Sequence, residues 1–510
     1  MPETFDVVVC GAGHNSLIAV CYLAKAGYEV CMLEARPLIG GDTASEELNE
    51  PGFLHDTCST FQPTLMGSPV LRDDELGLVA DYGLELVRPE VGVHMPFPDG
   101  ASITQYLDLE RTRDSIAELS RRDADAYVRM FEEWESVKSV FGRAANTPIG
   151  FGPPLDELLG ERPDGNRWRR RAALSAWDVV RHEFEEEHVR SFMTWMAAQT
   201  LQPVQRPGTG QLAFSVFANR QRHGWLVFKG GTGRFAEACG RLIRDHGGTI
   251  LTSKPVTQLV LEGGRCAGVE TADGERYLAR RAVLSTIHVK HLVEMAPRES
   301  WDEDFLDGVE LWKNGGTLFV TYLALAEPLP WPALAPGVPV ARLLQIGADW
   351  DAGRVNADDP PLLVACTSLV DPSRAPAGKH VAKILGMQPY ELADGGPERW
   401  DELKDEVSEA NIAQVRRYAP ALTDDVILAR TVKSPLDLER TNAHNWHGSC
   451  HGGDQGPAQS GRLRFQPRTP IPGLYQTGAT TYPGGSVTAA PGRNAARVLL
   501  EDLGSAWSHV

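Results

Sequence analysis

The sequence predicts an α/β protein in which a dinucleotide-binding unit at the N-terminus is combined with a second, mixed α+β domain. A strand, a glycine-rich turn, a helix and another strand follow one another over residues 5–34, the order of a nucleotide-binding βαβ unit. Another strand, glycine-rich turn and helix follow one another near the other end, over residues 473–500. The 510 residues exceed what one hydrophobic core usually supports, so we expect at least two domains.

The N-terminal unit starts with an apolar, β-branched strand over residues 5–10 and turns over residues 11–16, Gly-Ala-Gly-His-Asn-Ser. Gly11 permits the tight turn, Gly13 lets the backbone approach a pyrophosphate, and the following helix offers free N–H groups to it. A second strand, residues 28–33, is followed directly by Glu34, whose carboxylate is placed to accept hydrogen bonds from a ribose diol. This pattern predicts a bound dinucleotide and leaves both NAD and FAD open.

The composition describes an ordinary globular protein and excludes some partners. A net charge of −18 and a pI near 5.3 argue against nucleic acid, which requires a basic face. No apolar run reaches the length of a membrane span. The first residues show no basic segment followed by an apolar one, and the eight cysteines form no CxxC pair. We therefore expect reduced thiols and a cytoplasmic location.

A basic run at residues 167–171, Arg-Trp-Arg-Arg-Arg, has two interpretations. It fits a contact with an anionic surface, such as a membrane, which would make the protein peripherally membrane-associated. The more usual interpretation of such a run, which we favour, is the start of a solvated helix whose charge is offset by nearby acids such as Glu183 and Glu185.

Residues 225–300 alternate between helical and strand patterns. An amphipathic helix is expected over 235–246, and strands over 249–252, 256–262, 265–271 and 282–286. Gly263-Gly264 predicts a hairpin turn. The elements expected elsewhere are a helical part at about 105–220, strands at 317–324 and 362–368, and helices at 400–418 and from about Ser486 to Leu500.

Three separated motifs together resemble the phytoene-desaturase-like flavoprotein family within the glutathione-reductase-type FAD fold. They are GAGHNSLIAVCYLAKAGYEVCMLEARPLIGG at residues 11–41, FKGGTG at 228–233 with the strand that carries Val256, and LYQTGATTYPGGSVTAAPGRNAA at 474–496. The GHN sequence, residues 434–440 and residues 454–455 resemble most closely the pyridine-nucleotide-disulfide-oxidoreductase-like branch. Ser16 replaces the small apolar residue usual in the family.

The resemblance implies a Rossmann-type FAD-binding domain, glutathione-reductase-like, and a mixed α+β substrate domain, both discontinuous. The FAD-binding domain would comprise residues 1–75, 225–300 and 465–510, and the substrate domain residues 76–224 and 301–464. The residues implied to bind FAD are Gly11, Gly13, His14, Asn15, Ser16, Glu34, Ala35, Arg36, Gly40, Gly41, Val256, Gly478, Ala479, Pro483, Gly484, Gly485, Ser486 and Val487. Among these, Val256 would hold the adenine, and residues 483–487 would approach the isoalloxazine with a helix N-terminus aimed at N1 and O2.

If FAD is bound, the expected reaction is removal of hydride from a C–H of an apolar or amphipathic small molecule to flavin N5, most simply a C–C desaturation. Electrons would leave to oxygen, a quinone or a carrier. Alternatives are an amine-oxidase-type C–N dehydrogenation, a redox-neutral flavin isomerisation, or an interaction protein that keeps FAD as a structural element. The oligomeric state is left open.

The candidate acid/base residues are His447, His451 and Asp454, which belong to a dense titratable cluster just upstream of the C-terminal glycine-rich segment. The same stretch also fits a polar loop whose imidazoles bond main-chain carbonyls. His447, Cys450 and His451 show no recognisable tetrahedral spacing, so no metal site is expected. His14 and the pair His55-Asp56 are expected near the cofactor, in structural more than catalytic roles.

Overall fold

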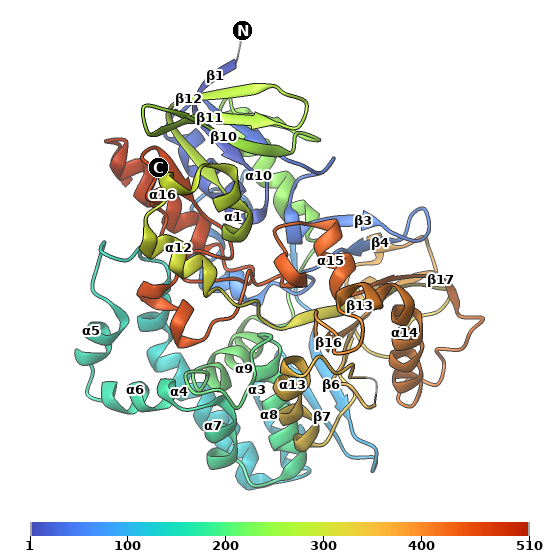
Figure 1. Ribbon diagram of the computed structural model, residues 1–510. Coiled ribbons are helices and arrows are strands. Elements are labelled where there is room, and N and C mark those ends of the chain that lie inside the picture. The colour runs from blue at the N-terminus through green and yellow to red at the C-terminus, as the bar shows by residue number, and fades with distance from the viewer. Residues whose placement is uncertain (1–2, 357, 508–510) are drawn as a thin grey trace.

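A computed structural model describes residues 3–356 and 358–507 of the chain. Two large sheets organise it (Figure 1), and each has its own set of covering helices. The first and last described elements, β1 (Glu3–Cys10) and α16 (Ala490–Asp502), lie in the same half of the molecule, with the first sheet. No helix in the described ranges is long and apolar enough to cross a membrane.

The first sheet has the strand order β10-β11-β12-β1-β2-β9, with β18 beside β12. Its strands are β1 (Glu3–Cys10), β2 (Val30–Leu33), β9 (Thr249–Leu251), β10 (Val256–Glu262), β11 (Arg265–Thr271), β12 (Arg276–Ser285) and β18 (Leu474–Gln476). The central strand β1 pairs in parallel with both β2 and β12. The β10–β11 hairpin turns at Gly263 and Gly264, which both have positive φ, as the two-glycine motif predicts.

Alternating side chains of β1 are buried on opposite faces of this sheet. Val7 and Val9 pack into a core with α1 (His14–Lys25), α10 (Gly233–Asp245) and α16 (Ala490–Asp502). Val8 and Cys10 face the other side, where α12 (Glu303–Glu310) contributes Phe305 and Val309 to a second core. A strand buried on both faces explains why the sequence VVVC is continuously apolar rather than alternating.

The second sheet has the strand order β17-β13-β16-β15-β14-β6-β7. Its strands are β6 (Val91–Pro96), β7 (Ser102–Tyr106), β13 (Thr317–Leu325), β14 (Ala333–Leu334), β15 (Leu363–Ala365), β16 (His380–Gln388) and β17 (Ile427–Lys433). Helix α14 (Trp400–Arg416) packs against the part of this sheet formed by β13 and β16, through Trp400 and Ile412.

A helical layer lies beside β6 and β7 and shares one core with them. Its helices are α3 (Leu109–Ala117), α4 (Arg121–Ala145), α5 (Leu155–Gly160), α6 (Gly165–Ala173), α7 (Ala176–Glu183), α8 (Glu187–Ala198), α9 (Leu212–His223) and α13 (Val340–Asp351). The short helices α2 (Pro69–Arg72), α11 (Val289–Leu292) and α15 (Pro435–Thr441) lie elsewhere along the chain.

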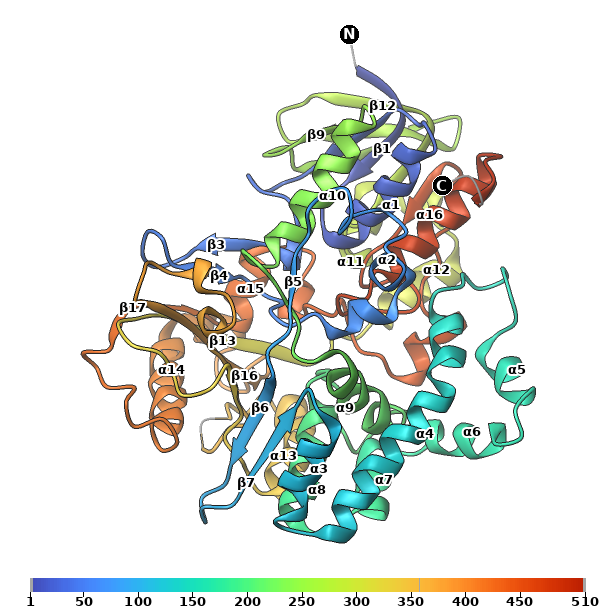
Figure 2. The same cartoon turned by 180° about the vertical axis from the view of Figure 1, so that it is seen from behind.

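Two connections run side by side between the sheets. β5 (Leu86–Val87) pairs antiparallel with β8 (Val227–Phe228), and Figure 2 shows this pair passing from one half of the molecule to the other. A short hairpin, β3 (Ser45–Glu47) and β4 (Leu54–Asp56), leaves the first half and reaches the second sheet, where Asn49 Nδ2 donates to the Tyr322 carbonyl at 3.3 Å.

Core packing carries the first domain beyond the boundaries expected at residues 75 and 300. Leu76, Leu78 and Leu84 belong to the core of α1 and α16. Trp301 and Trp312 belong to the core on the other face of β1. These side chains precede the points at which the chain enters the second sheet, at β6 (Val91–Pro96) and β13 (Thr317–Leu325), so they still pack against the first sheet.

The expected start of the C-terminal helix at Ser486 is wrong by four residues. Helix α16 begins at Ala490, and Ser486 and Ala489 both have left-handed backbone angles, with φ of 75° and 65°. A left-handed residue cannot continue a right-handed helix, so residues 486–489 are an irregular segment that precedes the helix. The apolar spacing of the sequence gave no sign of this.

Candidate active site

A cavity of about 760 Å³ lies at the carboxyl ends of β1 and β2. We call it the larger cavity. Its lining brings together Gly11, Gly13, His14, Asn15, Glu34, Ala35, Arg36, Gly41, Val256, Gly478 and Ala479. These residues come from three distant parts of the chain, and all of them are expected cofactor-binding residues. Ligands of open α/β sheets bind at this edge.

The turn after β1 has the geometry that a phosphate-binding loop needs. Gly11 has φ +90°, and a Cβ there would lie 2.3 Å from Thr286 Oγ1. A Cβ at Gly13 would meet no atom within 4 Å, so at this lining residue the backbone itself borders open space. Ser16 faces inward, donating to the carbonyls of Gly11 at 2.7 Å and Gly13 at 3.0 Å, and so holds the turn without lining the cavity.

Glu34 is fixed by main-chain donors at the end of β2. Its Oε2 accepts from Ala12 N at 2.7 Å and its Oε1 accepts from Arg36 N at 2.9 Å. Gly40 lies behind the lining, where its N donates to the Ala12 carbonyl at 2.8 Å. The carboxylate is therefore held in place beside the cavity with acceptor capacity to spare.

Four histidines line the larger cavity: His14, His288, His291 and His444. Burial lowers the pKa of His14 and of His444 to about 4. The buried Nε2 atoms of His288 and His291 have no hydrogen-bond partner in the described part of the chain. Sequence reasoning missed His288 and His291, because a histidine after a buried strand is not a distinctive signal by itself.

A second cavity of about 150 Å³ adjoins the first, and we call it the smaller cavity. His14, Asp42 and Cys450 line both cavities. Its remaining lining is Cys58, Ser59, Thr60, Phe61, Gln199, Leu201, Arg220, Leu318, Pro361, Leu363, Leu385, Gly386, Met387, His451, Ser486 and Val487. Most of these side chains are apolar, and they come from both halves of the molecule.

The C-terminal glycine-rich segment reaches the smaller cavity only through its last two expected residues, Ser486 and Val487. Pro483, Gly484 and Gly485 line neither cavity. Gly485 packs against the main chain of His451, and a Cβ added at Gly485 would lie 2.3 Å from the His451 carbonyl oxygen. This glycine therefore permits close backbone packing behind the cavity wall.

The three candidate acid/base residues lie in three different places. His451 lines the smaller cavity. His447 lines neither cavity and is stacked between Tyr390 and Trp446, with ring centroids 4.7 and 4.0 Å away. Asp454 borders a separate polar cleft and is ion-paired with Arg206. Of the three, only His451 is positioned to face a molecule in either cavity.

His451 has a defined tautomer. Its Nδ1 lies 3.0 Å from the Thr200 carbonyl oxygen, which can only accept, so Nδ1 carries the hydrogen. Burial lowers the pKa of His451, so the ring is neutral at pH 7. Its Nε2 is thus an unprotonated acceptor.

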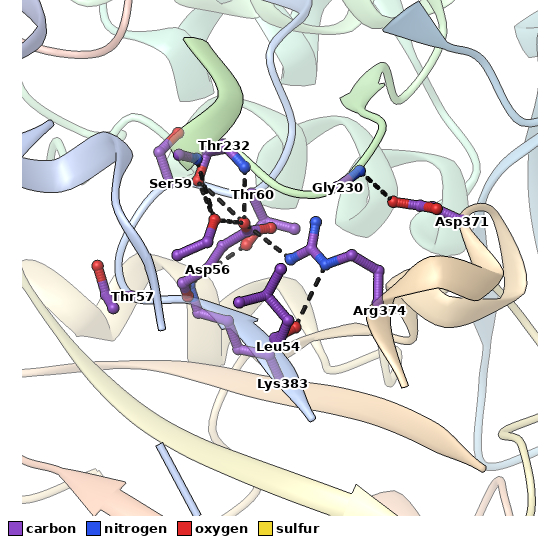
Figure 3. A network of polar contacts seen from close by, with 12 residues as sticks. Leu54, Asp56, Thr57, Ser59, Thr60, Gly230, Thr232, Asp371, Arg374 and Lys383 are labelled. Carbon is purple, nitrogen blue, oxygen red and sulfur yellow. Dashed lines mark hydrogen bonds and ion pairs between the residues drawn. The ribbon is translucent and has the colours of Figure 1, made fainter. Parts of the chain in front are cut away.

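The pair His55-Asp56 lines neither cavity, and Asp56 is the centre of a buried polar network (Figure 3). Asp56 Oδ1 lies 2.8 Å from Arg374 Nη2 and accepts from Thr232 N at 2.9 Å. Lys383 donates from below to the carbonyls of Asp56 and Cys58. Burial alone would raise the pKa of Asp56, but Arg374 and the hydrogen bonds outweigh it and hold that pKa below its usual value.

This network joins three stretches of chain at the boundary between the two sheets. It also holds two residues of the smaller cavity, because Lys383 Nζ donates to the Cys58 carbonyl and lies 3.3 Å from Thr60 Oγ1.

The basic run at residues 167–171 is largely neutralised within the molecule. Arg167 pairs with Glu133 at 2.7 Å, Arg169 with Asp156 at 2.5 Å, and Arg171 with Glu133 at 2.7 Å. Within residues 3–356 and 358–507, no cluster of three or more His, Cys, Asp or Glu side chains is arranged to hold a metal ion.

A glycine-turn cavity that adjoins a mostly apolar cavity at the boundary of two sheets is the arrangement expected of a nucleotide-binding protein with a separate site for a small molecule. Comparison with known proteins agrees. The family model for flavin-containing amine oxidoreductases matches residues 17–500, so the chain belongs to that family, and it is an FAD-dependent oxidoreductase with homologues of the phytoene desaturase type.

Among its relatives, a limonene dehydrogenase chain of Castellaniella defragrans is 27% identical, with 98% of this chain and 95% of the relative covered. Pyridine nucleotide-disulfide oxidoreductase domain-containing protein 2 of Mus musculus is 26% identical, with 98% and 94% covered. A lycopene-forming phytoene desaturase of Pseudescherichia vulneris is 25% identical, with 97% and 99% covered. A putrescine oxidase structure has the same fold, with a TM-score of 0.64 at 13% identity over 98% of this chain and 99% of that one.

The residues that line the larger cavity are themselves suited to bind FAD. It offers an open backbone surface at Gly13 and a fixed carboxylate at Glu34. Buried histidine nitrogens without partners border it as well. Buried polar atoms normally find hydrogen-bond partners, and the phosphates and hydroxyls of a dinucleotide would supply them.

Proposed function

We propose that this oxidoreductase removes hydride from a C–H bond of an apolar or amphipathic small molecule, most simply as a C–C desaturation. The observation that carries the proposal is the apolar smaller cavity, which adjoins the larger cavity through His14, Asp42 and Cys450. The names of two relatives, a limonene dehydrogenase and a phytoene desaturase, support the same class of reaction. FAD, when bound, supplies the hydride acceptor.

The proposal is tested by mixing the FAD-loaded protein anaerobically with cyclic alkenes, alkenyl acids and amines while the flavin absorbance is followed. We expect bleaching by an alkene or an alkenyl acid. Bleaching by amines alone would replace the proposal with an amine oxidation, and bleaching by none of these classes would overturn it. Oxygen, quinones and protein carriers then serve as candidate acceptors for reoxidation.

FAD would be held by the lining of the larger cavity, with Gly11 and Gly13 at the phosphates, Glu34 at a ribose and Val256 at the adenine. Because a carboxylate acceptor is worth about 1.5–3 kcal/mol, Glu34→Gln is expected to weaken FAD binding by about 10- to 100-fold. The change is measured by titrating FAD into the apoprotein. Glu50→Gln, on the exposed turn before Gly52, is the matched control. An unchanged dissociation constant for Glu34→Gln would contradict the assignment.

Desaturation also requires that a proton leave the neighbouring carbon. We assign its removal to Nε2 of His451, because that nitrogen is unprotonated and His451 lines the smaller cavity. His451 therefore acts only in its neutral form, and the rate of substrate-driven flavin reduction falls as the pH drops through the lowered pKa of this residue.

His451→Asn retains a donor for the Thr200 carbonyl but removes the base, so we expect flavin reduction to slow by about 100-fold or more. The decrease of the flavin-reduction rate at low pH should be absent in this variant. The measurement is anaerobic stopped-flow reduction of the flavin. His447→Asn is the control, and its rate should stay within about twofold of the wild-type rate because the ring lies outside both cavities. A wild-type rate of flavin reduction in His451→Asn would rule out His451 as the base.

Amine-type C–N dehydrogenation is the second candidate, because the family is described as flavin-containing amine oxidoreductases. One observation weighs against a protonated amine in the smaller cavity. The positively charged Arg220 forms part of its lining.

A further inference from the structure

Arg220 is a cation in the wall of an otherwise largely apolar cavity. It lies in the last turn of α9 and lines the smaller cavity. By surface area the residue is only half-buried, while burial lowers the pKa of its guanidinium to about 9. The two observations agree if the guanidinium lies deep in the protein and its exposed surface borders the smaller cavity instead of the outer solvent.

Its polar contacts are unusually poor for a buried arginine. Nη1 lies 3.2 Å from the Met196 sulfur, and the guanidinium carbon lies 4.3 Å from the centre of the Trp225 ring. Within the described ranges, no Asp or Glu oxygen lies within 4.0 Å of its nitrogens. The thioether is a weak acceptor, and the ring and the helix C-terminus offset only part of the cost of burying the charge.

Four arginines that are buried by surface area differ from Arg220 in this respect. Arg171, Arg374 and Arg493 each pair with a carboxylate, at 2.7, 2.8 and 2.8 Å. Arg464 donates to the main-chain carbonyls of Asp454, Gln459 and Ala479. The protein thus supplies oxygen acceptors to these four and leaves Arg220 with none in the same ranges.

The one carboxylate in the lining of the smaller cavity does not serve Arg220. Asp42 Oδ1 accepts from Asn442 Nδ2 and Asn445 Nδ2, both at 3.0 Å, beside the larger cavity. Among the described residues, no ion pair joins Asp42 to Arg220. The anion that would complete the arginine site is therefore an external one.

We propose that the substrate is amphipathic and carries a carboxylate that pairs with Arg220, while its apolar part lies against Phe61, Leu318, Leu385 and Met387. This deepens the proposed function, on which it rests, by assigning an anionic head group to the substrate. A planar carboxylate suits the fork of a guanidinium, with two parallel N–H···O bonds. Leu385 and Met387 stand on β16 of the second sheet, so that sheet would hold the apolar part of the molecule.

The test compares three six-carbon probes, hexanoate, hexanol and hexylamine, on the FAD-loaded protein. Binding is measured by calorimetry and by perturbation of the flavin spectrum. We expect hexanoate to bind at least about 10-fold more tightly than hexanol, since a charge-assisted hydrogen bond is lost in the alcohol, and hexylamine to bind least.

Arg220→Met should abolish the preference for hexanoate over hexanol, and Arg220→Lys should retain part of it. Arg222→Met is the matched control, because Arg222 lies on the same helix but is exposed and pairs with Glu135. That control should leave the preference intact.

The outcomes separate this inference from the proposed function. Equal binding of the three probes to the wild-type protein would overturn the carboxylate site even if an alkene bleaches the flavin. A preference for hexanoate that is lost in Arg220→Met supports the site even if none of the screened compounds reduces the flavin. If Arg220→Met instead weakens FAD binding and leaves the probe preference unchanged, the guanidinium serves the cofactor and the inference fails.

Discussion

Two arginines, both enclosed by protein, show how differently this molecule treats a buried positive charge. Arg374 is 1% exposed and lies against Asp56, which Thr232 and Ser45 also hydrogen-bond (Figure 3). Arg220 lines the smaller cavity with a thioether and an indole ring as its neighbours. The Arg374 guanidinium connects the two halves of the protein. The nitrogens of Arg220 remain available to the ligand that we propose.

The difference indicates which buried charges serve the fold and which serve the chemistry. A buried charge costs free energy unless a partner of opposite sign compensates for it. A protein retains an uncompensated charge where function requires it. The two sites should therefore respond in opposite directions when their charges are removed.

The largest effect is expected at Asp56. Asp56→Asn leaves the Arg374 charge buried without its counter-charge, so the free energy of unfolding should fall by about 3–5 kcal/mol. Urea denaturation followed by circular dichroism, at one fixed excess of FAD, measures it. Asp125→Asn breaks an exposed pair with Arg113 and should cost less than about 1 kcal/mol.

A double variant sharpens the same comparison. Arg374→Met combined with Asp56→Leu removes both charges and should recover much of the lost stability, because neither charge is then left alone. If the double variant loses as much unfolding free energy as the two single variants lose together, the packing around the network, and not the charge pair, determines how much the network stabilises the protein.

A smaller effect of opposite sign is expected at Arg220. Arg220→Met removes a charge that has no counter-ion in the described structure and keeps most of the side-chain volume. The free energy of unfolding should therefore rise by about 1 kcal/mol, as for other buried charges replaced by apolar groups. The same urea denaturation measures it. A loss of stability of similar size would mean that the contact with Trp225 outweighs the cost of burial.

Much of the nucleotide-binding half could be predicted, because its signals are local. The strand VVVC, the turn at Gly11 and Gly13, and Glu34 lie within one short stretch, and each has a backbone or charge requirement that few residue types meet. Sequence reasoning misplaced the start of the last helix, since apolar spacing does not reveal the left-handed angles at Ser486 and Ala489. It also grouped His447 and Asp454 with His451, which the folded chain places in three different environments.

The sequence by itself determined the class of cofactor-binding fold and most of the residues around the larger cavity. Only the tertiary structure decided which candidate base faces the smaller cavity, which aspartate is a buried structural anchor, and that the arginine of the smaller cavity has no carboxylate partner in the described ranges. The physical reason is the range of the interactions. A phosphate-binding turn is encoded in consecutive residues, whereas the environment of a side chain such as Arg220 depends on segments far apart in the chain, here Met196, Trp225 and the strands of the second sheet.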